Sequence, residues 1–417
     1  MRRGFWQFWL TFSLTLGILL IATLPAWNQP LSEDAGPRVI EPVLIQQTQT
    51  GRSQIDRPAF EALLQQASPR DAVPLLEELK AVEYQEHLGV SFYGSVPDLQ
   101  EVSDRLSQVA QQTGTNPAAI FVTSLESAID LLAVFPTPPR TARSPLQVAL
   151  LADSGPLTTP AAPQVFRTQV AVTNRESVRS VLQQLRQLTT DVNSTPEEYL
   201  VPAQQVYQWL VAPLEPTLRE KRIDTLVFVM DVGFRSIPLA ALYDGKQFVI
   251  EKYKVVMVPS FGLTDLRYRR QSDLRVLAMG ADRFPAQVPL PAVPPELSFI
   301  ARTISQTNTF LNQQFTLETL KTKSQQQQAD VIHLATHAEF QSGQIQNSYI
   351  QFWDSRLSLD QLQSLAREMK WDDPNARPIE MMVLSACRTA LGDRQAELGF
   401  TGLAIASGIK SAIGSLW

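Results

Sequence analysis

Cysteine is almost absent from this chain of 417 residues, which contains Cys387 and no other. A single cysteine cannot form an intrachain disulfide, so the chain is not a small exported domain held together by disulfides. An unpaired thiol is either a buried structural side chain, because cysteine packs as a small hydrophobe, or a reactive group. The cysteine count alone leaves both interpretations of Cys387 open.

Three further patterns are missing, and each absence argues against one class of ligand, partner or architecture. The sequence contains neither a GxGxxG nor a GxxxxGK phosphate loop, so we expect no nucleotide and no other cofactor. The formal net charge of −5 argues against nucleic acid as the main partner. A repeat of about 34 residues with the tetratricopeptide pattern is not recognisable either.

Charged residues are missing from the N-terminal segment between Arg3 and Glu33. The run Phe8–Leu24 within it is apolar enough for an export signal and nearly long enough to span a bilayer. Residues 1–30 are therefore predicted to be a signal peptide or an N-terminal membrane anchor, and the sequence leaves these alternatives open. With Arg2 and Arg3 inside, we expect an exported protein, either periplasmic or membrane-anchored and facing the periplasm.

Residues 31–115 are predicted to form a linker and a helical region. The stretch Gln29–Arg57 is rich in proline and glutamine, which is typical of a linker. Proline is tolerated in the first turn of a helix, and leucines recur at helical spacing in the stretches that follow. Helices are expected at Ala59–Ala67, from Pro74 to about Leu88, and at Val102–Thr113.

Further along, apolar runs and amphipathic segments predict an α/β fold with a mostly parallel sheet flanked by helices. A hairpin is expected from Phe248–Ile250 and Lys254–Val258. The other expected strands are Ala118–Ser124, Ala128–Phe135, Val165–Val172, Leu226–Met230, Leu274–Gly280, Ser348–Trp353 and Ile409–Trp417. The expected helices are Glu176–Leu188, Glu197–Arg219, Glu296–Ile304, Thr316–Gln327 and Ser358–Leu365.

Two more apolar runs, each predicted to be a buried strand, lead to side chains suited to nucleophilic chemistry. The run in Asp330–Phe340 leads to His337, and the run in Glu380–Asp393 leads to Cys387. Ligands bind outside the carboxyl ends of parallel strands, so the imidazole and the thiol can meet there. The imidazole can take the thiol proton and return it to a leaving amine. These features predict a cysteine nucleophile with a histidine base.

Ala386, Cys387 and Arg388 match the core of the caspase pattern, in which the histidine lies about 50 residues upstream. The sequence HLATHAEF together with VLSACRT resembles the CHAT domain family, caspase-like cysteine peptidases often associated with tetratricopeptide repeats. Asp224–Pro259 and Glu397–Trp417 also resemble parts of that family's domain. The resemblance extends back to about residue 116 and implies a caspase-like domain at 116–417. The family's domain normally continues further, so this domain is expected to be C-terminally incomplete.

The resemblance implies a cysteine endopeptidase that cleaves peptide bonds with a catalytic dyad of His337 and Cys387. Its partner would be a protein or peptide substrate. Backbone N–H groups of Ala338 and Cys387 would stabilise the oxyanion. The alternative is a catalytically inactive caspase-like interaction or scaffold module, which the incomplete C-terminus favours.

A metal-dependent hydrolase is a third and weaker interpretation. His333 and His337 have the H-x-x-x-H spacing, but Leu334 stands where the H-E-x-x-H metal motif requires glutamate. We therefore expect no metal site and a packed, hydrogen-bonded His333. Asp330 and Asp354 are expected to be ordinary surface carboxylates.

Overall fold

Every residue that the computed structural model describes belongs to the compact unit Pro42–Trp417, which is distinct from a second unit, Met1–Glu41. Neither the predicted signal or anchor segment nor Cys387 is among the described residues. Within the part that is described, no helix is both long and apolar enough to cross a membrane. The structure describes residues 45–47, 53–88, 96–137, 162–265, 273–285, 287–339, 348–371, 377–386 and 408–414.

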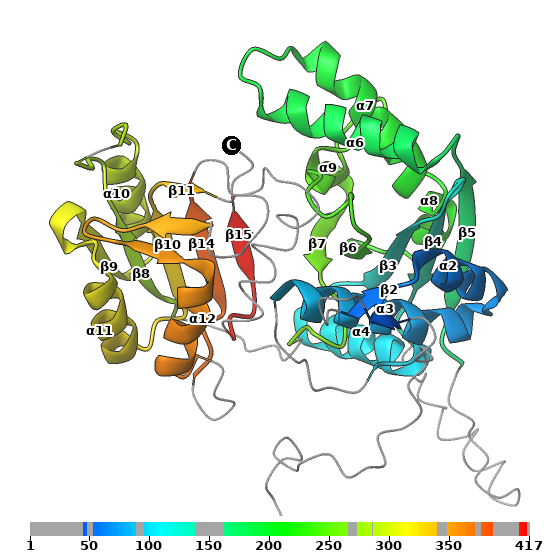
Figure 1. The fold of residues 1–417 in the computed structure, drawn as a ribbon, viewed down its shortest axis with the longest axis horizontal. Coiled ribbons are helices and arrows are strands. Elements are labelled where there is room, and N and C mark those ends of the chain that lie inside the picture. The colour runs from blue at the N-terminus through cyan, green and yellow to red at the C-terminus, as the bar shows by residue number, and fades with distance from the viewer. Residues whose placement is uncertain are drawn as a thin grey trace, which may run out of the picture. The chain divides into compact units, whose positions relative to one another are not determined.

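The first of two five-stranded sheets mixes antiparallel and parallel strands (Figure 1). Its strand order is β5 (Val165–Ala171), β4 (Ala128–Val134), β3 (Pro117–Ser124), β6 (Thr225–Met230) and β7 (Lys254–Val258). β4 is antiparallel to β3 and β5, whereas β3, β6 and β7 are parallel. β3, β4 and β6 are buried along almost their whole length, which fits apolar runs inside a sheet covered on both faces.

Helices cover both faces of this sheet. One face shares its apolar core with α6 (Arg175–Thr190), α7 (Pro196–Leu210) and α8 (Glu215–Glu220). α3 (Pro69–Leu88) and α4 (Leu99–Thr113) contact β3, β4 and β5 outside that core, and therefore cover the other face. The burial of both faces explains why the apolar runs here do not alternate.

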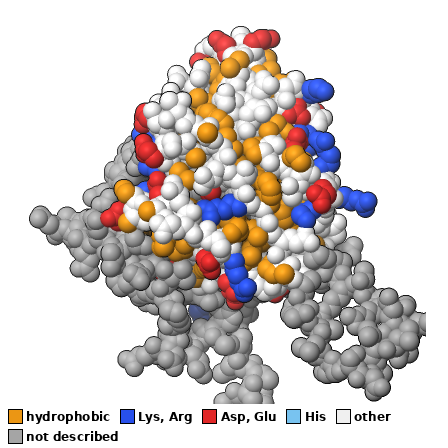
Figure 2. Space-filling model, turned by 90° about the vertical axis from the view of Figure 1, so that its right-hand side faces the viewer, with side chains coloured by type: hydrophobic (Ala, Val, Ile, Leu, Met, Phe, Trp, Pro, Cys, Tyr) orange, Lys and Arg blue, Asp and Glu red, His pale blue; other side chains and the backbone are white. Residues whose placement is uncertain are grey.

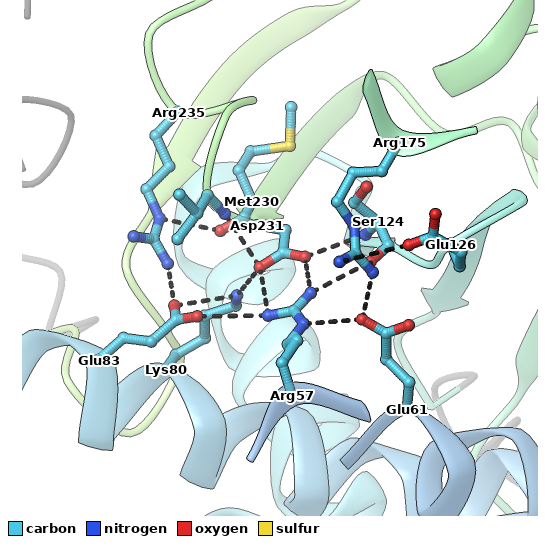
Figure 3. Close-up of polar contacts among 11 residues, drawn as sticks. Arg57, Glu61, Lys80, Glu83, Ser124, Glu126, Arg175, Met230, Asp231 and Arg235 are labelled. Carbon is cyan, nitrogen blue, oxygen red and sulfur yellow. Dashed lines mark hydrogen bonds and ion pairs between the residues drawn. The ribbon is translucent and has the colours of Figure 1, made fainter. Parts of the chain in front are cut away.

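A network of buried charges ties the N-terminal helices to the end of β6 (Figure 3). Asp231, the residue after β6, accepts hydrogen bonds from Arg57 of α2 (Arg57–Gln66) and from Lys80 of α3, the latter at 2.9 Å. Glu83 of α3 pairs with Lys80 and with Arg235. Because the side chains of Lys80 and Asp231 are each only 1% exposed, each charge depends on its partner for solvation.

The second five-stranded sheet is parallel throughout. Its order is β15 (Ala412–Gly414), β14 (Met381–Ser385), β10 (Val331–Ala335), β8 (Arg275–Gly280) and β9 (Gln306–Leu311). α10 (Val293–Thr303) packs on one face, and α11 (Leu317–Gln327) and α12 (Leu359–Glu368) pack on the other. The predicted α/β class with mostly parallel pairing and flanking helices is confirmed, but the described residues form two five-stranded sheets where a single sheet was expected.

The prediction of a hairpin at Phe248–Ile250 and Lys254–Val258 is wrong. Val249–Lys252 forms the short helix α9, and β7 follows it parallel to β6. The Glu251 side chain caps this helix by accepting from the Phe248 N–H at 2.6 Å. Lys252 is held by Glu215 and Asp244. These contacts favour a helical turn that the apolar run alone does not indicate.

Two details of the N-terminal prediction also change. Within the expected linker, β1 (Ile45–Gln47) and β2 (Ser53–Ile55) form an antiparallel pair, and Arg57 already belongs to α2. α3 begins at Pro69 rather than at Pro74. Pro74 lies near the start of that helix, where the missing N–H removes a single bond.

The expectation that Asp330 is a surface carboxylate is wrong, because its side chain is fully buried. It accepts hydrogen bonds from the Arg275 backbone N–H at 3.0 Å and from the Arg377 side chain at 2.6 Å. Both donors come from distant parts of the chain, so no local pattern revealed them. Asp330 thereby joins the starts of β8, β10 and β14.

The surface of the described residues mixes charges of both signs. On the face shown in Figure 2, Lys and Arg side chains are interspersed with Asp and Glu among scattered apolar side chains. This mixture agrees with the small formal net charge of the chain, −5.

Candidate active site

The register between β10 and β14 equals the spacing between the two predicted catalytic residues. Val331 pairs with Met381, and Ala335 pairs with Ser385, so paired residues are 50 positions apart along the whole ladder. The Thr336 N–H extends the ladder by donating to the Ser385 carbonyl at 3.0 Å. Cys387 itself lies outside the described residues.

The ring of His337 is oriented by a backbone carbonyl. Its Nε2 lies 2.7 Å from the carbonyl oxygen of Val288, in the segment between β8 and α10. A carbonyl oxygen can only accept a hydrogen bond, so Nε2 carries a proton and Nδ1 is the basic nitrogen of the neutral ring. The Phe284 ring packs against the imidazole, with the two centroids 5.2 Å apart. His337 is thus held in the tautomer that presents Nδ1 to a proton donor.

An open hollow lies beside this ring. It has a volume of about 570 Å³ and is lined by Pro285, Gln287, Val288 and His337. Val288 is 74% exposed, so it offers an apolar surface next to the imidazole. The hollow can therefore admit a flexible chain that approaches from solvent.

The backbone N–H of Ala338 is directed away from its neighbouring strand. Ala338 lies in β11 (Ala338–Glu339), which pairs antiparallel with β12 (Tyr349–Gln351) in a small sheet completed by β13 (Arg356–Ser358). The Gln351 N–H donates to the His337 carbonyl at 2.9 Å. This bond makes Ala338 and Ile350 a non-hydrogen-bonded pair, in which both N–H groups point outward. The Ala338 N–H is consequently not used between β11 and β12.

His333 has a separate role from His337. It is buried, and its Nε2 lies 2.9 Å from Oε1 of Glu296 in α10. Burial raises the pKa of Glu296, but hydrogen bonds from His333 and Ser385 outweigh it, so the pKa is lowered overall. The prediction of a packed, hydrogen-bonded His333 is confirmed. Among the described residues, no three His, Cys, Asp or Glu side chains are grouped to hold a metal.

Gly280, at the end of β8, permits a close contact next to the site. A Cβ at this position would lie 2.4 Å from the Ala335 carbonyl oxygen and 2.8 Å from a methyl carbon of Val293. Any side chain would therefore push β8 away from β10 and from α10. No sequence pattern distinguishes this glycine from the others.

Comparison with known protein families matches residues 200–417 to the CHAT domain. The chain belongs to the CHAT domain family. The family is caspase-like, and the matched region starts within α7 and includes β6, β7 and the whole second sheet. β3, β4 and β5 precede the match, although β3 pairs with β6 in the first sheet. No curated protein matches the chain.

Sequence reasoning missed Val288, Glu296 and Gly280 as contributors to this site. Val288 contributes its backbone carbonyl, and because every residue has one, the residue type does not indicate this role. Glu296 is a single acid in a predicted helix and resembles any surface carboxylate in sequence. Only the packing of α10 against the sheet brings Glu296 to His333 of β10.

Proposed function

We propose that this CHAT domain is a caspase-like cysteine endopeptidase in which His337 is the general base and Cys387 the nucleophile. The main support is the hydrogen bond from His337 Nε2 to the Val288 carbonyl, because it leaves Nδ1 as the basic nitrogen. The ladder register supports the same pairing, since residues on β10 and β14 are matched at the separation of His337 and Cys387.

The proposed reaction begins with proton transfer from the Cys387 thiol to His337 Nδ1. The thiolate attacks the carbonyl carbon of the scissile peptide bond, and the carbonyl electron pair moves to oxygen. The N–H groups of Ala338 and Cys387 would donate to this oxyanion. When the intermediate collapses, the C–N bond breaks and the leaving amine takes the proton from His337. Water, deprotonated by His337, then hydrolyses the thioester and regenerates the thiol.

The orientation of the Ala338 N–H fits the oxyanion role. Its pairing with Ile350 leaves the donor outside the ladder, so a substrate oxygen would not have to displace a partner on β12. The hollow beside His337 offers space for the substrate on the side of Val288. Alanine rather than glycine at this position keeps the donor and adds a single methyl group.

Covalent trapping tests the proposal, and the single cysteine makes the result unambiguous. A peptide with a thiol-directed acyloxymethyl ketone is incubated with the full chain near neutral pH, and the intact mass is measured. We expect one adduct in the wild type and none in Cys387→Ala. His337→Ala should slow trapping by on the order of 100-fold, because a general base typically contributes that much.

His87→Ala serves as the matched control, because His87 lies in α3 and is the only histidine outside β10 and the residues that follow it. We expect it to be trapped at the wild-type rate. A folded wild type that reacts no faster than a free cysteine peptide would refute the peptidase and leave the inactive interaction module as the function.

A further inference from the structure

Glu296 connects helix α10 to strands β10 and β14 of the second sheet, and His337 follows β10. It lies in the first turn of α10, and its carboxylate is bonded to His333 Nε2 at 2.9 Å. The Ser385 hydroxyl donates to the same carboxylate. His333 belongs to β10, and Ser385 is the last residue of β14. A single side chain thus joins a helix to the two strands that precede His337 and Cys387.

The segment from Asp282 to Glu296 carries the carbonyl that orients His337. Near its start, the Asn312 side chain donates to Asp282 at 2.6 Å, and the Leu290 N–H donates to the Asp282 carbonyl at 2.8 Å. At its other end, Glu296 is fixed to β10 and β14. Val288 lies between these two anchors, so the position of its carbonyl depends on both of them.

The hydrogen bonds made by Glu296 suit an ionised carboxylate. Both partners, the His333 ring N–H and the Ser385 hydroxyl, donate to it. Its side chain is 30% exposed, so water can solvate the remaining lone pairs. The His333 ring, in turn, is only 10% exposed and is kept in one orientation. This arrangement is well suited to hold α10 and the two strands at fixed distances.

We propose that Glu296 is a positioning residue for the Cys387–His337 site. By clamping His333 and Ser385, it fixes the carboxyl ends of β10 and β14 and the Val288 carbonyl that selects the His337 tautomer. The proposal rests on the proposed function, because it assigns Glu296 a role in that same reaction. Glu296 bonds to His333 and Ser385 and acts on the site through these neighbours.

Alkylation of Cys387 by iodoacetamide, measured from pH 5 to pH 9, tests this role without depending on substrate binding. Glu296→Ala should lower the rate at neutral pH by about tenfold, since a small misplacement of a catalytic group has effects of this size or larger. It should also move the midpoint of the pH–rate profile upward, toward the value of about 8.5 for a free thiol. Because unfolded molecules would also react as free thiols, the rates are measured under conditions in which circular dichroism shows each variant to be folded.

Two variants serve as comparisons. Glu296→Gln keeps an oxygen that can accept from His333 and Ser385, so we expect it to restore the rate to within about threefold of the wild type. Glu318→Ala removes an exposed acid from the first turn of α11, on the opposite face of the sheet, and should behave as the wild type. If Glu296→Ala does not fold, Ser385→Ala removes one of the two clamping bonds and should shift the midpoint in the same direction.

The outcomes separate this inference from the proposed function. A wild type that is alkylated like a free thiol, with no effect of His337→Ala, refutes the proposed function itself. If the wild type shows fast, His337-dependent alkylation but folded Glu296→Ala keeps the same rate and midpoint, only the role of Glu296 is refuted. If Glu296→Ala does not fold, an unchanged midpoint in folded Ser385→Ala refutes the inference instead.

Discussion

Replacing Asp231 by asparagine should strongly destabilise the first sheet and its N-terminal helices. The Asp231 carboxylate accepts from Lys80 at 2.9 Å, from Arg57 at 3.1 Å and from the Ser124 N–H at 3.0 Å (Figure 3). Asparagine offers one acceptor oxygen instead of two, and its NH₂ group would face one of these donors. The variant therefore removes a negative charge and also leaves a buried donor without an acceptor.

The expected loss follows from the burial of the pair. Breaking a buried ion pair by removing one partner typically costs about 3–5 kcal/mol. Lys80 keeps Glu83 as a partner at 3.2 Å, so the lower end of that range, about 3 kcal/mol, is expected here.

The pH dependence of this loss has a defined sign. Burial raises the pKa of Asp231, but Arg57 and Lys80 outweigh it and hold that pKa well below its usual value. A lowered folded-state pKa contributes stability above the unfolded-state pKa of about 3.9 and loses it as the pH falls through the folded-state value. The difference between wild type and variant should therefore stay constant from pH 5 to pH 8.

Urea unfolding at pH 7 measures this difference directly. Asp104→Asn, on the exposed side of α4, serves as the matched control and should change the stability by less than about 0.5 kcal/mol. Adding Lys80→Met to Asp231→Asn should recover part of the loss, because it removes the uncompensated cation. A loss in Asp231→Asn no larger than that in the control would refute the claim that the buried charges hold these helices to the sheet.

Three further predictions concern other parts of the chain. Gly280→Ala should lower the free energy of unfolding in urea by about 1–3 kcal/mol and slow Cys387 alkylation, because its Cβ would collide with the Ala335 carbonyl. A variant with the stability and alkylation rate of the wild type would contradict the close packing. Burial raises the pKa of Glu77 to about 7, so its contribution to stability should fall as the pH rises from 5 to 7 and then level off. The melting temperature of the wild type should therefore fall relative to that of Glu77→Gln over that interval, and a constant difference would be evidence against it. We also propose export through the N-terminal segment. The full chain should then fractionate with membrane or periplasm, and a chain lacking Met1–Trp27 should stay cytosolic. A cytosolic full chain with an intact N-terminus would contradict this.

The central strands could be predicted because both faces of each are buried. Continuous apolar runs such as those of β3 and β6 indicate such strands without any knowledge of their partners. β9 was missed, since its sequence QTNTFL is mostly polar and it lies at an edge of its sheet. α9 was mistaken for a strand because the ion pairs of Lys252 with Glu215 and Asp244, which stabilise the helix, leave no pattern in the apolar run itself.

The site could be predicted only as far as side-chain identity carries the chemistry. His337 stood out because it follows an apolar run and precedes Cys387 by the spacing of the caspase pattern. The Val288 carbonyl could not be found in this way, because every residue carries one. Glu296 and Asp330 were overlooked for a related reason: their hydrogen-bond partners come from separate strands.

The pH dependence of Cys387 alkylation in the wild type and in His337→Ala is the most direct test of the Cys–His pair. If His337 accepts the thiol proton, the wild type should react rapidly near neutral pH, with a midpoint below the value of about 8.5 for a free thiol. His337→Ala should move the midpoint toward that value and slow the reaction at neutral pH. Identical profiles for the two folded proteins, with a midpoint at or above that of a free thiol, would show that Cys387 is a structural cysteine.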